Sequence, residues 1–282
     1  MKNFNPYFFL QVRTIHESPQ QITISIGQSN LKKTFFHFLW SIVAAIIFST
    51  SIGYSQTPTG EEILKAIDAN TIAGNRSATS TMTIHGRRTS RSITAKSWIQ
   101  GENQSFTEYL APAREKGTKM LKIDDQLWMY SPQSDRVIRI AGHMLRQSMM
   151  GSDLSYEDMM EDQSLLDTYQ AEVLGSESIG DRDCWVVQLT AKKDDVAYPS
   201  RKTWVDKERM IPLREDRNAK SGKLLKTTSI EEVFQIEGRW YPKRMIFKDA
   251  LSKGEGTEFI IDEISFDVDI PEHLFSKASL RK

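Results

Sequence analysis

Residues that could carry catalysis are few in this sequence and lie far apart. Beyond position 55 the histidines are His85, His143 and His273, and the one cysteine is Cys184. No two histidines have the spacing of a zinc-binding helix, and a single cysteine cannot supply a thiolate metal site. The sequence also has no nucleophile elbow, phosphate-binding loop or dinucleotide-binding glycine motif. We therefore expect a protein that binds rather than an enzyme, with no cofactor and no metal.

Acidic residues gather between positions 153 and 162, where calcium binding is the chemistry to consider. They are Asp153, Glu157, Asp158, Glu161 and Asp162. Their order lacks the D-x-D-x-D-G pattern of a calcium-binding loop. Ser155 precedes most of them and is a suitable cap for a helix, whose first turn favours negative charge. We interpret these carboxylates as the solvated face of a covering segment.

The same window, His143 to Glu161, is rich in methionine. Five of the chain's 11 methionines lie there: Met144, Met149, Met150, Met159 and Met160. Methionine is flexible and polarizable, so it fills irregular space and adapts to partners of different shape. Either the thioethers plug the interior of the fold, or they line a cavity for a variable, chain-like apolar ligand. The second interpretation predicts a pocket of several hundred Å³ with a mainly apolar lining.

Aromatic residues outside the window, and two more residues inside it, complete the candidate cavity. The candidate ligand-binding residues are Trp98, Phe106, Trp128, Tyr130, Met144, Met149, Met150, Leu154, Tyr156, Met159 and Met160. Three arginines, Arg136, Arg139 and Arg146, flank the start of the window. They are either ordinary surface charges or a rim that meets lipid head groups or an acidic partner, because guanidinium binds phosphate and carboxylate bidentately.

The N-terminal part of the sequence predicts export. Lys32 and Lys33 precede an apolar run over residues 35–48, and small and polar residues follow up to Ser55. A positive patch, an apolar stretch of about 7–15 residues and a small-residue exit are typical of a secretory signal peptide. We expect an N-terminal extension and signal peptide over 1–55, with the signal itself over 31–55 and cleavage near Ser55.

Charge and cysteine content restrict the partners and the redox chemistry. The chain has 37 basic and 37 acidic residues, and four basic residues and one acidic residue belong to 1–55. The remainder therefore has 33 basic and 36 acidic residues, a net charge of −3. A nucleic-acid-binding protein would be strongly basic, so we expect no nucleic-acid partner. Cys184 cannot form an internal disulfide, and its alternation with apolar neighbours predicts a buried strand residue.

The elements that must position these residues begin with one helix. Over residues 60–74 apolar side chains recur at helical spacing, acidic residues occupy the first turn, and Gly74 is a suitable stop. After the helix the period changes to two, in short segments bounded by turn residues. We expect a single domain over 56–282 that is mainly β: a curved antiparallel half-open barrel of about eleven strands.

A sheet of this size curls or closes, and its apolar face needs a cover. The segments available are the N-terminal helix and the central window, so we expect a helical or loop segment over 141–167, here called the lid, to cover the barrel. Exposing an acyl chain to water costs about 0.8 kcal/mol per methylene group, so a half-open barrel with a lid is suited to sheltering one.

Several blocks of the sequence resemble the LolA-like family of outer membrane lipoprotein-sorting proteins. They are "LWMYSP", "RVIRI", "RQSMMGSDLSYEDM", "KTWVDKERMIPLRE" and "DVDIPEHLFS", and the resemblance spans most of residues 60–278. It implies an incomplete antiparallel barrel with a helical cap and an apolar cavity that accepts acyl chains.

The resemblance also implies a periplasmic carrier that hands lipidated proteins or lipids towards the outer membrane. Its partners would be lipoprotein acyl chains or lipid, an inner-membrane exporter and an outer-membrane acceptor, and we expect a monomer. Two alternatives remain. One is a periplasmic accessory or sensor subunit of an envelope lipid exporter, which binds without transport. The other is a structural barrel with a filled interior.

Overall fold

A computed structural model of the chain describes residues 57–281, except positions 73, 87, 162 and 163. The extension and signal peptide predicted over 1–55 lie outside the described residues. Within the described part, no helix is both long enough and apolar enough to span a bilayer.

The predicted N-terminal helix is present as α2, Gly60–Thr71. Thr59 caps it, because its hydroxyl accepts a hydrogen bond from the backbone N–H of Glu62 while the Glu62 carboxylate accepts one from the backbone N–H of Thr59. Ile63, Leu64 and Ile67 are buried on one side of α2.

Close packing fixes the first turn of α2. The buried apolar residues of α2 (Ile63, Leu64 and Ile67) pack against Tyr169, Val187, Leu189 and Val205. A Cβ atom on Gly60 would lie only 2.2 Å from the carbonyl oxygen of Ala171, so the first turn approaches β7 more closely than any other residue type allows.

The remaining elements form one antiparallel sheet of thirteen strands. The strands are β1 (Arg76–His85), β2 (Ser90–Gln100), β3 (Gln104–Ala111), β4 (Lys119–Ile123), β5 (Gln126–Ser131), β6 (Arg136–Ile140), β7 (Tyr169–Ile179), β8 (Arg182–Ala191), β9 (Ser200–Asp206), β10 (Pro212–Asn218), β11 (Leu224–Ile236), β12 (Arg239–Asp249) and β13 (Thr257–Phe266). The mainly β, half-open fold is as predicted, with thirteen strands instead of about eleven.

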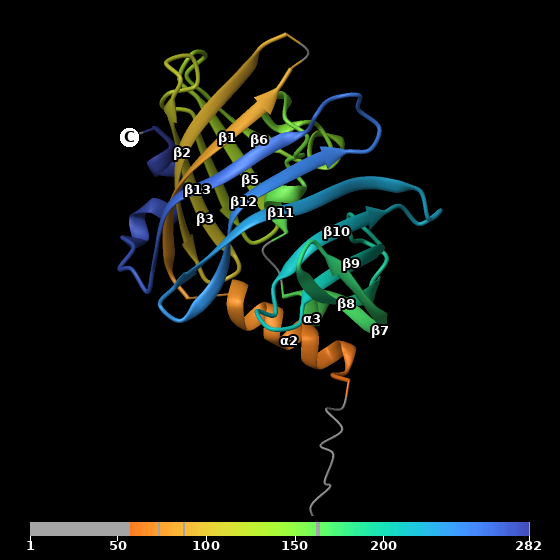
Figure 1. Ribbon diagram of the computed structural model, residues 1–282. Helices are drawn as coiled ribbons and strands as arrows, with labels where there is room; N and C mark the ends of the chain where they lie inside the picture. Colours follow the sequence, from red (N-terminus) through yellow and green to blue (C-terminus); the bar gives the residue numbers. More distant parts are fainter. Residues whose placement is uncertain (1–56, 73, 87, 162–163, 282) are drawn as a thin grey trace, which may run out of the picture. The chain divides into compact units, whose positions relative to one another are not determined.

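The strand order explains why the sheet is a broken ring. Consecutive strands are neighbours everywhere except between β6 and β7, and β1 pairs with β13, so β6 and β7 form the two edges of the described sheet. The lid leaves β6 at one edge and enters β7 at the other. In Figure 1, α2 crosses the lower end of this sheet beside β7 and β8.

The two faces of the sheet bury different clusters, because side chains alternate along each strand. On β5, Leu127 belongs to a cluster beneath the lid, whereas its neighbour Trp128 belongs to a second cluster. We call the first the inner face and the second the outer face. The outer face of β3–β5 is covered by η4 (Glu272–Phe275) and η5 (Lys277–Arg281). Figure 1 shows these C-terminal turns at the left edge of the view.

A further apolar cluster lies at the β8–β10 end of the sheet. Cys184 is fully buried there with Val186, Trp204, Ile211 and Leu213, as the alternation around Cys184 predicts.

The lid is built from short turns rather than from one helix. Its elements are η1 (Gly142–Met144), η2 (Met149–Gly151), η3 (Asp158–Met160) and the start of α3 (Leu165–Thr168). Met150 and Gly151 both adopt positive φ values, 52° and 73°, which end η2. Ser155 does accept a hydrogen bond from the backbone N–H of Asp158, as a cap would, but only a single 3₁₀ turn follows it.

Candidate ligand cavity and lid

The lid residues of the predicted site pack together on the inner face. Met149, Leu154 and Tyr156 are buried, and Met144, Met150, Met159 and Met160 are partly buried against them. The hydroxyl group of Tyr109 donates to the sulfur atoms of Met120 at 3.3 Å and of Met149 at 3.7 Å. The methionines therefore fill the space under the lid, which is the first of the two interpretations given above.

The four aromatic residues of the predicted site lie on the other face of the sheet. Trp98, Phe106, Trp128 and Tyr130 belong to the outer cluster under η4 and η5. The rings of Trp98 and Phe106 lie 6.0 Å apart, and the Lys277 ammonium group lies 4.3 Å from the Trp128 ring centre. The expectation that these aromatics and the lid methionines line one cavity is therefore wrong in its geometry, because strand alternation sends them to opposite faces.

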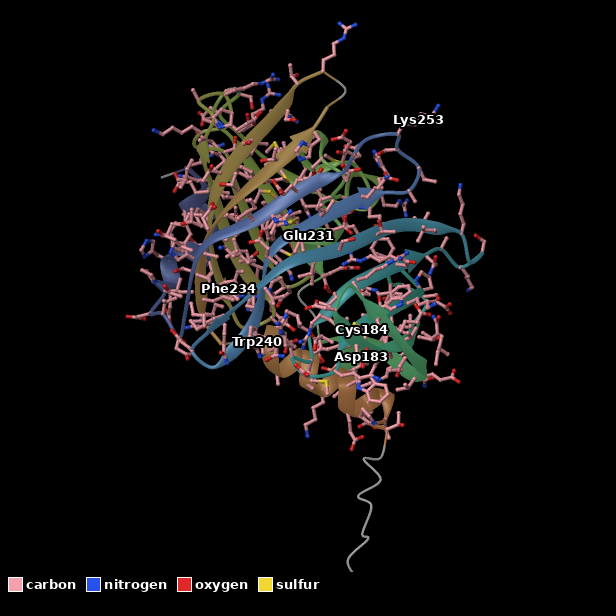
Figure 2. The ribbon with its side chains drawn as sticks, in the orientation of Figure 1. Asp183, Cys184, Glu231, Phe234, Trp240 and Lys253 are labelled. Carbon is pink, nitrogen blue, oxygen red and sulfur yellow. The ribbon has the colours of Figure 1, made fainter. Side chains whose placement is uncertain are left out.

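A cavity of about 280 Å³ opens instead between α2, the end of the lid and strands β9–β12. Its apolar wall comes from α2, the turn before β10, and β11 and β12: Ile67, Ile72, Met210, Ile211, Ile230, Trp240, Met245 and Phe247. Figure 2 shows Trp240 on β12, next to α2. Phe247 also packs against the cluster beneath the lid, so the cavity adjoins the lid methionines without being lined by them.

The opposite wall of the cavity is charged. It includes Glu161 from the lid, Arg201 from β9, and Glu215 and Arg217 from β10. We define the ionic cluster as Asp158, Glu161, Arg201, Glu215, Arg217 and Lys226. Its sheet residues share the inner face of three neighbouring strands, because Arg217 is paired with Arg201 on one side and with Lys226 on the other.

The lid carboxylates are held by the cations of the sheet. Arg201 Nη2 donates to Glu161 Oε1 at 2.7 Å, and Arg217 Nη1 lies 2.9 Å from Glu161 Oε2. Arg217 Nη1 also donates to Asp158 Oδ1 at 3.1 Å, and Lys226 Nζ donates to the other Asp158 oxygen. The Tyr198 hydroxyl group donates to Asp158 Oδ1 at 2.7 Å.

Glu215 connects the two arginines within the sheet. Arg217 Nε donates to Glu215 Oε1 at 2.6 Å, and Arg201 Nη1 donates to the same oxygen at 3.3 Å. The Tyr169 ring stacks against Arg201, with the guanidinium carbon 4.6 Å from the ring centre. Both arginines are thereby held in position by groups of the protein itself.

Neighbouring cations lower the pKa values of two carboxyl groups of the cluster. Burial alone would raise the pKa of the Asp158 carboxyl group, but the charges of Lys226 and Arg217 lower it below its usual range. The pKa of Glu215 is lowered in the same way, since the charges of Arg201 and Arg217 outweigh the effect of burial. The Asp158 side chain is only 3% exposed. The prediction of a solvated acidic face is therefore wrong for Asp158, and Glu161 is mostly buried as well.

Two further anchors hold the lid. Asp153, also predicted to be solvated, accepts a hydrogen bond from the Thr257 hydroxyl group at 2.8 Å and one from the backbone N–H of Asp249 at 3.0 Å. Near the end of the lid, the Asp68 carboxylate of α2 accepts hydrogen bonds from the backbone N–H groups of Leu165 and Leu166, both at 3.1 Å. The polar residues of the lid thus fasten it to the barrel.

The three predicted rim arginines are not members of the ionic cluster. Arg136 and Arg139 are exposed on the edge strand β6, and Arg146 is exposed in the lid. A role in contacting head groups or a partner stays a prediction for them. Arg91 of β2, in contrast, donates to the backbone carbonyl of Met150 and so supports the lid.

Sequence reasoning missed the cations that receive the lid carboxylates. Arg201, Arg217 and Lys226 lie on three different strands, and a single strand shows only an alternating charge, as in Glu215 and Arg217. That alternation was the available signal. It could not reveal the partner, because the lid acids are about 40 to 70 residues away in sequence.

Residues 101–282 match a family model described as "Uncharacterized protein". No curated protein matches the chain.

Three solved structures share the fold. A domain from Vibrio parahaemolyticus, described in terms of outer membrane lipoprotein sorting, has a TM-score of 0.71 at 24% identity and covers 79% of this chain and 98% of its own. A DUF1329 family protein from Desulfovibrio piger has a TM-score of 0.71 at 26% identity, covering 78% and 97%. A LolA superfamily protein from Nitrosomonas europaea has a TM-score of 0.67 at 25% identity, covering 79% and 100%.

Proposed function

We propose that this chain, which shares its fold with a solved structure of the LolA superfamily, is a carrier that shelters an acyl chain in the cavity between α2, the lid and β9–β12. The observation that carries the proposal is the cavity itself, with its apolar wall on α2, β11 and β12. Binding, not catalysis, is the activity proposed. A carrier of acyl chains needs a cavity with an apolar wall, and this chain has one.

The size of the cavity limits what the closed protein holds. Its volume of about 280 Å³ lies just below the range of about 300–1,000 Å³ that is usual for drug-sized ligands, so it accepts only part of a long acyl chain. Each methylene group removed from water contributes about 0.8 kcal/mol. A longer acyl chain needs additional room, which a shift of the lid would provide.

The broken ring supplies a route for the ligand. The lid covers the inner face and joins the edge strands β6 and β7, so it can move without breaking any pairing of the sheet. A ligand that binds the open state better than the closed state shifts the population towards opening. Release follows when a partner binds the open, ligand-free protein better than it binds the loaded protein.

We place this carrier in the periplasm, after removal of a signal peptide near Ser55. It would receive lipoprotein acyl chains or lipid from an inner-membrane exporter and deliver them to an outer-membrane acceptor. The resemblance of the lid block "RQSMMGSDLSYEDM" to the family supports this placement.

Cavity filling tests the proposal. Ile230 lines the cavity on β11, and the next residue, Glu231, is exposed; Figure 2 labels Glu231 near the middle of the sheet. We expect Ile230→Trp to abolish binding of a fluorescent fatty acid, whereas Glu231→Trp leaves it unchanged. Equal binding by the two folded variants would contradict the assignment of the cavity.

Native mass spectrometry of protein purified from its own envelope supplies the second readout. Copurifying lipid or lipopeptide that is lost in Ile230→Trp is the expected result. A stable protein complex that contains no lipid would contradict the carrier and favour an accessory or sensor subunit.

A further inference from the structure

The sheet and the lid contribute different charges to the ionic cluster. Its three cations, Arg201, Arg217 and Lys226, and one anion, Glu215, belong to the sheet, whereas Asp158 and Glu161 belong to the lid. The closed cluster is balanced, with three positive and three negative groups. The sheet part alone carries a net charge of +2, so any movement of the lid uncovers a cationic site.

This cationic site lies at the ligand cavity. Arg201 and Arg217 form part of the cavity wall opposite the apolar residues of β11 and β12. The cavity therefore has an apolar part and, beside it, a cationic part now filled by lid carboxylates. An amphiphile with an anionic head group has the same two parts.

Arg201 carries a donor that the closed protein does not use. The residue is 5% exposed, and its Nε atom is buried without a hydrogen-bond partner among the described residues. Nε and Nη2 form one edge of the guanidinium group, the edge that binds a phosphate or carboxylate with two parallel hydrogen bonds. Of these two donors, only Nη2 donates a hydrogen bond to Glu161. The lid carboxylate is thus an incomplete ligand for Arg201.

We propose that Arg201, Arg217 and Lys226 bind the phosphate of an anionic lipid head group, and that Asp158 and Glu161 of the lid occupy this site until the lipid displaces them. This inference rests on the carrier function proposed above and adds a head-group class and a lid mechanism to it. A phosphate offers more acceptor oxygens than a carboxylate, so it can engage Nε and Nη2 of Arg201 together. Removal of Asp158 and Glu161 from the cluster then coincides with arrival of the charge that replaces them.

A pair of lipids with the same acyl chains tests the head-group preference. The probes are fluorescent phosphatidylglycerol, which is anionic, and fluorescent diacylglycerol, which lacks phosphate. We expect the protein to bind phosphatidylglycerol at least about tenfold more tightly, equivalent to about 1.4 kcal/mol. Arg201→Gln should remove this preference. Arg214→Gln is the matched control, because Arg214 is an exposed arginine of β10 that pairs with Asp216 instead of the lid.

A second variant tests the lid mechanism and does not depend on the folding of Arg201→Gln. Glu161→Gln removes one lid carboxylate and leaves all three cations in place. We expect it to bind phosphatidylglycerol more tightly than the unmodified protein does, with no matching gain for diacylglycerol. Its melting temperature should also rise more with phosphatidylglycerol than with diacylglycerol.

The outcomes separate this inference from the carrier function. Binding of neither lipid would overturn the carrier itself. Equal binding of both lipids, unchanged in Arg201→Gln and Glu161→Gln, would leave the carrier intact and overturn the head-group site. Competition by inorganic phosphate without any preference between the two lipids would reassign the site to a free anion, and would also overturn the inference.

Discussion

Asp158 shows how a single side chain can connect the lid to the barrel. It accepts hydrogen bonds from residues of the sheet and from Ser155 within its own turn. Its neighbours in sequence lie in other surroundings, because the chain turns at η3. Met159 packs against the apolar cluster beneath the lid, and Glu157 is half-buried. The alternation of acidic and thioether side chains in this window thus reflects two tasks: fastening the lid and filling the space below it.

Removing the charge of Asp158 should destabilise the protein strongly. In Asp158→Asn the side chain keeps its size, but Arg217 and Lys226 lose a buried counter-charge. Loss of one partner from a buried ion pair costs about 3–5 kcal/mol, and we expect a decrease of that order in the free energy of unfolding measured in urea. Asp194→Asn is the control, because Asp194 and Lys220 form an exposed pair. An equally small effect of both substitutions would contradict the anchoring role.

Acid should loosen the lid. The pKa values of Asp158 and Glu215 are lower in the folded protein than in the unfolded chain. Their contribution to stability is therefore complete above the unfolded pKa values, about 4, and is lost as the pH falls through the lowered folded values.

Hydrogen exchange of the lid amides between pH 6 and pH 3, corrected for the intrinsic pH dependence of exchange, measures this loosening. Protection should fall at the acidic end, and it should fall less in Asp158→Asn, which has lost one of the two titrating groups. Protection that is independent of pH would contradict the prediction.

At the scale of elements, the period of the sequence predicted the strands and the helix well but not the contacts between them. Alternation in β2 separates Ile93 and Ala95 from Trp98, so the division of the sheet into two faces was visible in the sequence. Which face the lid covers depends on the curl of the whole sheet. The C-terminal turns η4 and η5, which cover the other face, have no period that predicts their position.

The contact between α2 and β7 provides a test at this scale. Gly60→Ala places a Cβ atom 2.2 Å from the carbonyl oxygen of Ala171, and backbone atoms cannot give way cheaply. We expect the free energy of unfolding to decrease by about 1–3 kcal/mol, as in other overpacked sites, although alanine is the better helix former. Lys65→Ala, at an exposed position of the same helix, should change it little. A more stable Gly60→Ala variant would show that α2 has room to move.

At the scale of the molecule, the break between β6 and β7 leaves the sheet of thirteen strands half-open. A closed ring of this kind would need its interior filled or permanently enclosed. The break leaves one seam, and the lid is the chain that crosses it. Sequence reasoning predicted both the half-open barrel and its cover. The cavity lies farther from the lid methionines than expected, because those methionines fill the space beneath them.

The affinity for fatty acids of increasing length should reveal how long an acyl chain the cavity accepts. For fatty acids from six to sixteen carbons, we expect the binding free energy to improve by about 0.8 kcal/mol per methylene group until the cavity of about 280 Å³ is full, and then to level off. Isothermal titration calorimetry measures this series. Ile230→Trp should level off at a shorter chain length. Affinity that does not depend on chain length would contradict acyl binding in the cavity.

The burial of Cys184 determines how the protein would respond to oxidants. Its thiol is fully enclosed at the β8–β10 end of the sheet, and burial raises its pKa, so the reactive thiolate is scarce. Two copies of the protein therefore cannot become crosslinked through it while the sheet is intact, and oxidants reach it only after that end of the barrel has come apart.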